Sequence, residues 1–126
     1  MSLHESGQMY LEAIYVLLGK GDKIRAIDIG AYLGYSKPSV SRAVGILKSG
    51  GFISVDADGY ITMTALGKSV AEQLYERHTV LTEMLISLGV DEAIAAEDAC
   101  RIEHVISDES FAAVKAHFSR KNNQST

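Results

Sequence analysis

Apolar and polar positions alternate along the first third of the chain with the spacing of amphipathic helices. Residues 5–18 predict a helix that ends at Gly19, with one apolar stripe formed by Leu11, Ile14, Tyr15 and Leu18 at spacings of three or four. Residues 26–33 predict a second, short helix. Ser36 is a favourable N-cap residue, so a third helix is expected to begin there and to run to about Lys48.

The pattern then changes to short runs of β-branched and aromatic residues. Residues 52–55 and 60–63 predict two strands, and the Asp-Ala-Asp-Gly segment between them is typical of a hairpin turn. Helix, short turn, helix and hairpin follow one another in the order of a winged helix-turn-helix domain.

The second half of the chain predicts helices alone. A long helix capped by Thr64 is expected to reach Gly89. Asp91 and Ser107 are favourable N-caps for two further helices, the first of which is expected to continue through Ile106. These helices carry more apolar residues than one small domain can bury, so we expect an isologous homodimer.

The last helix is expected to end near Phe118, and the polar tail from Ser119 is expected to be frayed.

Composition excludes several classes of protein. The chain has 126 residues, of which 47% are hydrophobic and 22% charged, as in globular domains and unlike disordered chains. No apolar run approaches the roughly 18 residues of a membrane span, and the start does not resemble a secretory signal. Cys100 is the single cysteine, so an intrachain disulfide is impossible. We therefore expect a cytoplasmic protein without a membrane partner.

The net charge of −4 is distributed unevenly. Residues 1–63 hold six basic and six acidic residues, whereas residues 64–126 hold six basic and ten acidic ones. No acidic residue lies between Asp28 and Asp56, a window that contains three basic residues. Such a window is a candidate nucleic-acid surface, although on charge alone a solvated helix face is the favoured explanation.

The third helix has the composition of a DNA-reading helix. In a helix-turn-helix this helix enters the major groove, where small hydroxyl side chains allow close approach and an arginine reaches a guanine edge or a phosphate. Asp56 and Asp58 at the hairpin tip would repel phosphate, so the helix carries the prediction. For each serine alone, a capping or surface hydroxyl is the alternative. The predicted DNA contacts are Arg25, Ser36, Lys37, Pro38, Ser39, Ser41, Arg42 and Lys48.

A second constellation carries metal chemistry. Cys100, Glu103 and His104 stand at i, i+3 and i+4, which places them on one helix face. A thiolate, a carboxylate and an imidazole together suit a first-row divalent metal. The first helix and the long helix offer further donors. The candidate ligands are Met9, Glu12, His78, Cys100, Glu103 and His104.

Each ligand has a structural alternative. A lone cysteine is more often a buried structural residue, a methionine is more often a core filler, and the glutamates could be surface charges. On the opposite side of the Cys100 helix, Ile102, Val105 and Ile106 are expected to pack into the core. The combination of three donors on one face favours metal, and the absence of a CxxC spacing argues against a zinc finger.

We therefore predict a mainly α protein of two domains. Residues 1–63 would form a winged helix-turn-helix DNA-binding domain, and residues 64–126 an all-α dimerisation and metal-binding domain.

Two passages, residues 9–15 and 97–109, resemble the diphtheria toxin repressor and manganese transport regulator family of metal-dependent transcriptional repressors. The start of the third helix and the Arg77-His78 pair add support, and the resemblance covers about residues 5–118. It is to the short form that lacks an SH3-like domain. It implies a homodimer that binds a pseudo-palindromic double-stranded DNA operator when loaded with metal and represses metal-uptake genes. In this family, metal at the joint between the domains would set the spacing of the two reading heads.

The resemblance also sorts the ligands. The primary site of the iron-responsive branch is matched by Met9, Cys100, Glu103 and His104. Glu12 instead resembles the manganese branch, and His78 matches a ligand of both branches. The ancillary ligands of the iron branch fall at Ala96 and Thr82, so that site is not expected in its usual form. A second ion held by Glu12 and His78 stays open.

Fe(II) or Mn(II) is the expected cofactor, and the soft donors favour Fe(II). Co(II), Ni(II) and Zn(II) are expected to substitute in vitro. The alternative function is a winged-helix regulator without metal control that responds to a small ligand or a partner protein. A small metal hydrolase is a third class, but no nucleophile elbow, P-loop or HExxH motif is present, so we expect neither an enzyme nor an organic small-molecule substrate.

Overall fold

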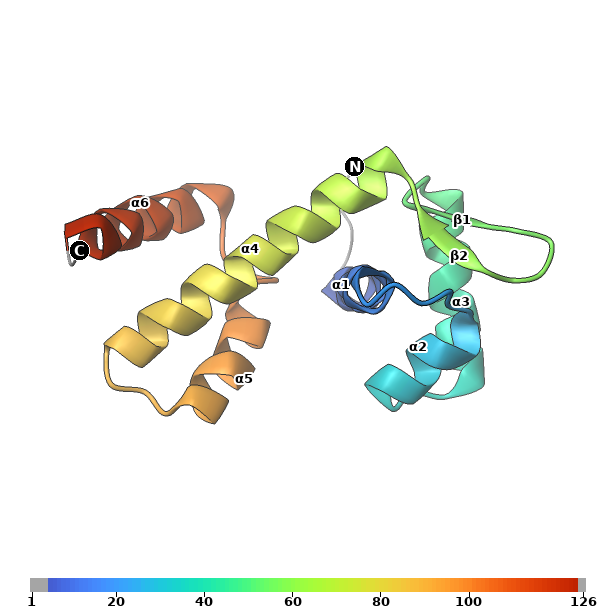
Figure 1. Ribbon diagram of the computed structural model, residues 1–126, viewed down its shortest axis with the longest axis horizontal. Helices are drawn as coiled ribbons and strands as arrows, with labels where there is room; N and C mark the ends of the chain where they lie inside the picture. Colours follow the sequence, from blue (N-terminus) through green and yellow to red (C-terminus); the bar gives the residue numbers. More distant parts are fainter. Residues whose placement is uncertain (1–4, 125–126) are drawn as a thin grey trace. The chain divides into compact units, whose positions relative to one another are not determined.

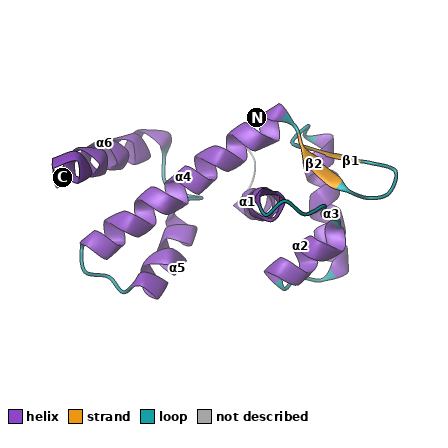
Figure 2. Ribbon diagram, viewed as in Figure 1, coloured by secondary structure: helices purple, strands orange, loops and turns teal. Residues whose placement is uncertain are grey.

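The computed structural model describes residues 5–124 and consists mainly of helices with one short hairpin (Figures 1 and 2). The elements in chain order are α1 (Glu5–Gly19), α2 (Ala26–Leu33), α3 (Lys37–Ser49), β1 (Ile53–Val55), β2 (Ile61–Met63), α4 (Ala65–Ser87), α5 (Glu92–Ile102) and α6 (Asp108–Gln124). This order confirms the predicted mainly α fold, in which a winged helix-turn-helix precedes further helices. No helix among the described residues combines the length and apolarity needed to cross a bilayer.

Contacts divide the chain into two compact units, and the boundary falls inside α4, between Gln73 and Leu74. Because α4 is one continuous helix, its sequence shows no break where the contacts change. The boundary between residues 63 and 64 stays a prediction.

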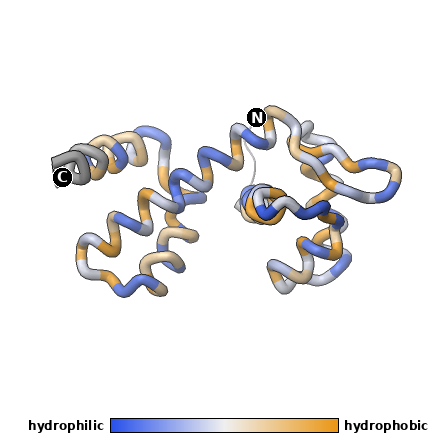
Figure 3. The backbone as a smooth tube through the Cα atoms, viewed as in Figure 1, coloured by the Kyte–Doolittle hydropathy of each residue, from blue (hydrophilic) through white to orange (hydrophobic). Residues whose placement is uncertain are grey.

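Hydrophobic and hydrophilic residues alternate along the helices of the first unit (Figure 3). Its core is built around Leu11 and Ile14 of α1, Ile29 of α2, Leu47 of α3 and Phe52, all of which are buried. The apolar stripe predicted for α1 is therefore confirmed at Leu11 and Ile14. Because α1, α2 and α3 all contribute residues to this core, the three helices pack together as one compact body.

The turn of the helix-turn-helix follows from two local signals. Gly34 ends α2 in the left-handed conformation, with φ of 74°, and donates its N–H to the Gly30 carbonyl at 2.8 Å. Ser36 then caps α3, because its Oγ accepts the N–H of Ser39 at 3.4 Å. A Cβ at Gly30 would lie 3.4 Å from the Tyr35 carbonyl, so a small residue is favoured where the turn approaches α2.

The hairpin pairs β1 with β2 in antiparallel fashion. Its turn is held by Asp56, whose Oδ1 accepts the N–H groups of Asp58 and Tyr60, each at 2.9 Å. Ile61 also donates its N–H to the Ile24 carbonyl at 2.9 Å, which attaches the hairpin to the segment between α1 and α2. Each strand is one residue shorter at its start than predicted.

The start of α4 is packed tightly against the hairpin base. Thr64 caps the helix as predicted, because its Oγ1 accepts the Gly67 N–H at 3.1 Å and donates to the Gly51 carbonyl at 2.6 Å. A Cβ at Gly67 would lie 1.9 Å from the Phe52 carbonyl oxygen, so only glycine fits there.

The second unit contains the rest of α4 together with α5 and α6. Its central buried cluster consists of Leu81, Ala99 and Phe111, one from each helix. Partly buried residues that pack against this core are Val80, Met84, Ile102, Ile106 and Val114. This core is smaller than that of the first unit.

The α5 helix ends at Ile102, well before the end predicted at Ile106. The Val105 N–H bonds to the Ile102 carbonyl at 3.0 Å, an i→i−3 contact that tightens the chain into a turn. Val105 is 73% exposed, so the prediction that it packs into the core was wrong. Ile102 and Ile106 do pack against the core, as predicted.

Ser107 begins α6 as predicted, because its Oγ accepts the Ser110 N–H at 3.1 Å. The helix continues to Gln124, so the predicted end near Phe118 was wrong, whereas the predicted fraying of the tail stays a prediction. The final two residues of the tail lie outside the described part of the chain.

Candidate metal centre and DNA-reading surface

The end of α5 brings three predicted metal ligands together. Glu103 follows the helix but keeps helical backbone angles, with φ of −58° and ψ of −28°, and its N–H bonds to the Ala99 carbonyl at 2.9 Å. The predicted i, i+3, i+4 geometry therefore survives the early end of the helix. One donor atom each from Cys100, Glu103 and His104 lie within 4.8 Å of one another.

The fourth ligand in this unit comes from α4. His78 Nδ1 lies 3.3 Å from Glu103 Oε2, and His104 Nε2 lies 3.3 Å from Glu103 Oε1. The Glu103 side chain is completely buried, and neither of its carboxylate oxygens accepts a hydrogen bond from any described residue. A buried carboxylate that accepts no hydrogen bond is costly unless a cation is nearby.

The donor set fits a divalent transition metal. With bonds of about 2.3 Å to sulfur and about 2.1 Å to nitrogen or oxygen, two ligands of one ion lie at most roughly 4.4 Å apart. The donor atoms of Cys100, Glu103 and His104 lie within 4.8 Å of one another, so only small side-chain adjustments would bring them to that spacing. An ion bound by Cys100, Glu103 and His104 would also supply the positive charge that the Glu103 carboxylate needs.

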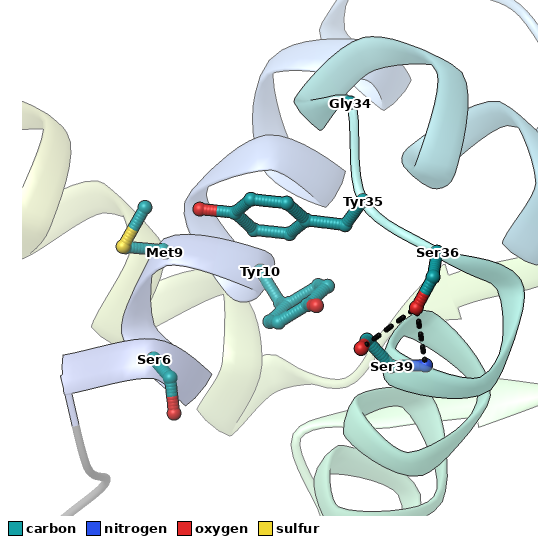
Figure 4. A pocket seen from close by; sticks show the side chains of 7 residues that line it. All are labelled: Ser6, Met9, Tyr10, Gly34, Tyr35, Ser36 and Ser39. Carbon is teal, nitrogen blue, oxygen red and sulfur yellow. Dashed lines mark hydrogen bonds between the residues drawn. The ribbon is translucent and has the colours of Figure 1, made fainter.

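Met9 and Glu12, the other predicted ligands, lie on α1 in the first unit, and both are half-buried. Met9 lines a pocket of about 370 Å³ beside the start of α3, together with Tyr10, Tyr35 and Ser39 (Figure 4). The Tyr10 and Tyr35 ring centroids are 5.7 Å apart. Burial, followed by the proximity of Tyr35, raises the pKa of Tyr10 above its usual value of 10.0.

All eight residues predicted to contact DNA have exposed side chains. On α3 the buried face consists of Val40, Ala43 and Leu47, which leaves the opposite face with Ser41 and Arg42 open to solvent. Ser36 and Ser39 are joined by a hydrogen bond of 2.9 Å between their hydroxyls, so the capping role considered for serine applies to this pair. Capping leaves these side chains on the exposed surface.

A basic and aromatic cluster lies beside the turn end of the hairpin. The Arg25 guanidinium lies 4.3 Å from the Tyr60 ring centroid, and Lys23 Nζ lies 5.2 Å from the same centroid. Sequence reasoning selected Arg25 but missed Lys23 and Tyr60. The missed signal is Ile24, since its alternation with two basic neighbours is the pattern of a short strand and it pairs with Ile61.

Large apolar side chains are exposed around the connection between α4 and α5. They are Ile86, Leu88 and Ile94, with Leu88 71% exposed. A folded domain rarely leaves such side chains grouped on its surface without a partner.

Two family descriptions match the chain. Residues 2–61 match the N-terminal DNA binding domain of iron dependent repressors, and residues 64–122 match their metal binding and dimerisation domain. The transcriptional regulator MntR of Salmonella typhi is 35% identical over 107 residues, which cover 85% of this chain and 68% of MntR. The diphtheria toxin repressor of Corynebacterium diphtheriae is 32% identical over 108 residues, which cover 85% of this chain and 48% of that repressor.

The solved structures that resemble this chain include a metal-dependent repressor. A manganese-dependent transcriptional repressor in complex with manganese matches with a TM-score of 0.82 and 25% identity, over 90% of this chain and 52% of that one. The chain thus spans about two thirds of MntR and about half of the longer repressors.

Proposed function

Because the chain belongs to the diphtheria toxin repressor and MntR family of metal-dependent transcriptional repressors, we propose that it represses metal-uptake genes when loaded with Fe(II) or Mn(II). It carries the family's DNA-binding domain and its metal-binding and dimerisation domain. The observation that carries the proposal is the buried Glu103 carboxylate, which lies between two imidazoles and close to a thiol.

We propose the six predicted ligands as the metal-binding residues. Cys100, Glu103, His104 and His78 would hold the ion within the second unit, and Met9 and Glu12 would contribute from α1. A bound divalent ion supplies the positive charge that a cluster of carboxylate, thiolate and imidazole donors can share. The soft sulfur donors of Met9 and Cys100 favour Fe(II) over Mn(II), because Mn(II) prefers oxygen ligands.

The DNA interface would centre on the exposed face of α3. Arg42 is proposed to read a base edge or hold a phosphate, while Lys37 and Lys48 neutralise phosphates. The predicted contacts at Ser36, Pro38, Ser39 and Ser41 would let the helix approach the groove closely. Arg25, supported by Tyr60, is proposed as a contact to the DNA backbone from beside the hairpin turn.

Dimerisation is supported by the apolar surface formed by Ile86, Leu88 and Ile94. In a homodimer, this surface on one copy of the chain would pack against the same surface on the other copy, and the two copies would be related by a two-fold axis. Two reading heads related by a two-fold axis match a pseudo-palindromic operator.

First, a DNA duplex that the protein binds is selected from random sequences, once with metal and once without it. Metal-free protein is then titrated anaerobically with Fe(II) or Mn(II), and binding to the selected duplex is measured. Binding is expected only with metal, and Cys100→Ala is expected to abolish the response. The matched control is Glu97→Gln, which changes an exposed carboxylate on the same helix and is expected to respond as the parent does. Operator binding that neither metal nor Cys100→Ala changes would overturn the proposal.

A regulator that responds to a small organic ligand remains the second candidate, and the pocket that contains Tyr10 and Tyr35 favours it. In that case, metal-free protein would bind its operator fully, and Tyr35→Ala would alter the response while Cys100→Ala would not.

A further inference from the structure

Arg77 of α4 joins three segments of the second unit. Its Nη1 donates to the Glu103 carbonyl at 3.2 Å and to the Ile106 carbonyl at 2.8 Å. Its Nη2 forms an ion pair with Asp108 at the start of α6. The guanidinium carbon also lies 5.3 Å from the centroid of the Phe111 ring.

The two carbonyl groups bracket the turn that carries metal ligands. Carbonyls beyond the last turn of a helix lack the N–H partners that the helix interior provides. A guanidinium presents several donors in one rigid plane, so Arg77 can bind two carbonyls and a carboxylate at once. His104 lies between the two bound carbonyls of Glu103 and Ile106, so its backbone is held on both sides.

In the middle of this turn the His104 side chain is buried, whereas Val105 is not. Val105 follows His104 and is 73% exposed, so it contributes little packing. Arg77 is the described residue whose side chain bonds to both ends of the turn. Backbone bonds from the Val105 and Ile106 N–H groups to the Ile102 carbonyl close the turn, and the two Arg77 bonds add to them by fixing the carbonyls at either end.

The carbonyl bonds matter more than the ion pair. The Asp108 side chain is 98% exposed, so solvent screens its charge, whereas the Arg77 side chain is only 15% exposed. The aromatic ring of Phe111 further restricts the guanidinium on its other side. The two carbonyl bonds are therefore the part of the Arg77 contacts that fixes the turn.

Adjacent residues of α4 thus approach Glu103 at two points. Arg77 bonds to its backbone carbonyl, and the neighbouring His78 lies 3.3 Å from its carboxylate. We propose that Arg77 is a positioning residue that preorganises the turn of Glu103 and His104 and thereby raises the affinity of the metal centre. This inference rests on the proposed function, because it concerns the metal named there.

The experiment uses Co(II) as the probe, because a thiolate–Co(II) bond gives a charge-transfer absorption that reports coordination directly. Arg77→Met keeps the length of the apolar stem and removes the donors. It is expected to weaken Co(II) binding about 10- to 100-fold, the usual effect of losing a group that orients a ligand. Arg77→Lys, which retains one compact donor group, is expected to fall between Arg77→Met and the parent.

Two controls separate the carbonyl bonds from charge. Asp108→Asn removes the ion pair alone and is expected to change Co(II) affinity less than about 3-fold. Arg101→Met removes an exposed arginine of α5 that pairs with Glu97 and is expected to behave as the parent does.

A second measurement does not depend on metal. Amide hydrogen exchange of residues 103–107 in the metal-free protein is expected to quicken in Arg77→Met and to stay unchanged in Arg101→Met. The inference needs both effects, so either parent Co(II) affinity or parent exchange in Arg77→Met would overturn it.

A parent protein without the charge-transfer band would defeat the metal proposal itself, and the exchange result would still decide whether Arg77 orders the turn. If Arg77→Met loses the circular dichroism of the folded chain, Arg77→Lys decides in its place, and parent affinity there overturns the inference.

Discussion

The two candidate sites of this protein are built in opposite ways. The DNA-reading face of α3 is exposed, and the serine cap that starts the helix is a contact between near neighbours in the sequence. The metal centre depends on a buried Glu103 that is approached by His78, which lies far away in the chain. Local signals place an exposed site, whereas a buried charged site depends on tertiary contacts that bring distant segments together.

This comparison predicts its largest effect at Glu103. Glu103→Gln is expected to lower metal affinity by about 100-fold or more, because it removes the charged donor at the centre of the cluster. The same change is expected to raise the free energy of unfolding of the metal-free protein by about 1 kcal/mol, because a neutral amide replaces a buried carboxylate. Isothermal titration and chemical denaturation measure the two effects.

The matched control is Glu97→Gln on the exposed side of α5. It is expected to leave both measurements within about 0.5 kcal/mol of the parent. Equal metal affinity in Glu103→Gln and the parent would contradict this prediction, because the buried carboxylate would then matter no more for metal binding than the exposed one.

A second prediction concerns the packing that supports the reading face. Gly67→Ala is expected to destabilise the protein by about 2 kcal/mol or more, because the added Cβ would lie 1.9 Å from the Phe52 carbonyl oxygen. Gly45→Ala on α3 meets no atom within 4 Å and is expected to stabilise by about 0.5 kcal/mol. Thermal unfolding of the two variants checks the contrast, and similar midpoints would contradict it.

The difference between local signals and tertiary contacts also explains which features could be predicted from the sequence. The start of α3 was predicted at Ser36, because an N-cap followed by proline is a local signal. The three donors at the end of α5 were predicted from helical spacing. That Val105 would be exposed was not predictable, because the i→i−3 turn after Ile102 follows from packing rather than from a local breaker.

Arg77 shows the limit of pattern analysis most clearly. Its partners Glu103 and Ile106 stand 26 and 29 positions away, and both are contacted through backbone carbonyls. Every residue has a backbone carbonyl, so no residue type in the sequence marks these contacts. The sequence identified Arg77 only through a family resemblance, and the role of Arg77 became visible only in the fold.

A third prediction tests whether the two sites can be separated. Arg42→Ala is expected to lower affinity for the selected operator about 10-fold, close to 1.4 kcal/mol, through the loss of a base or phosphate contact. Metal affinity is expected to stay unchanged, because Arg42 is exposed on α3 in the first unit. Fluorescence anisotropy with labelled duplex and a separate metal titration measure both quantities. A parallel loss of metal affinity would contradict the separation.

The smallest predicted effect sharpens the boundary of the exposed site. Lys23 and Lys20 lie on the same connection between α1 and α2, but Lys23 lies over Tyr60 beside the hairpin turn, whereas Lys20 lies over Tyr32 of α2. If the Tyr60 cluster contacts the DNA backbone, Lys23→Ala should reduce the slope of log affinity against log salt by about 0.9, the value for one phosphate contact. Lys20→Ala carries the same change of charge, so any effect of net charge alone would appear equally in both variants. A slope that falls only for Lys23→Ala assigns the contact to the Tyr60 cluster, and equal slopes would restrict the reading surface to α3.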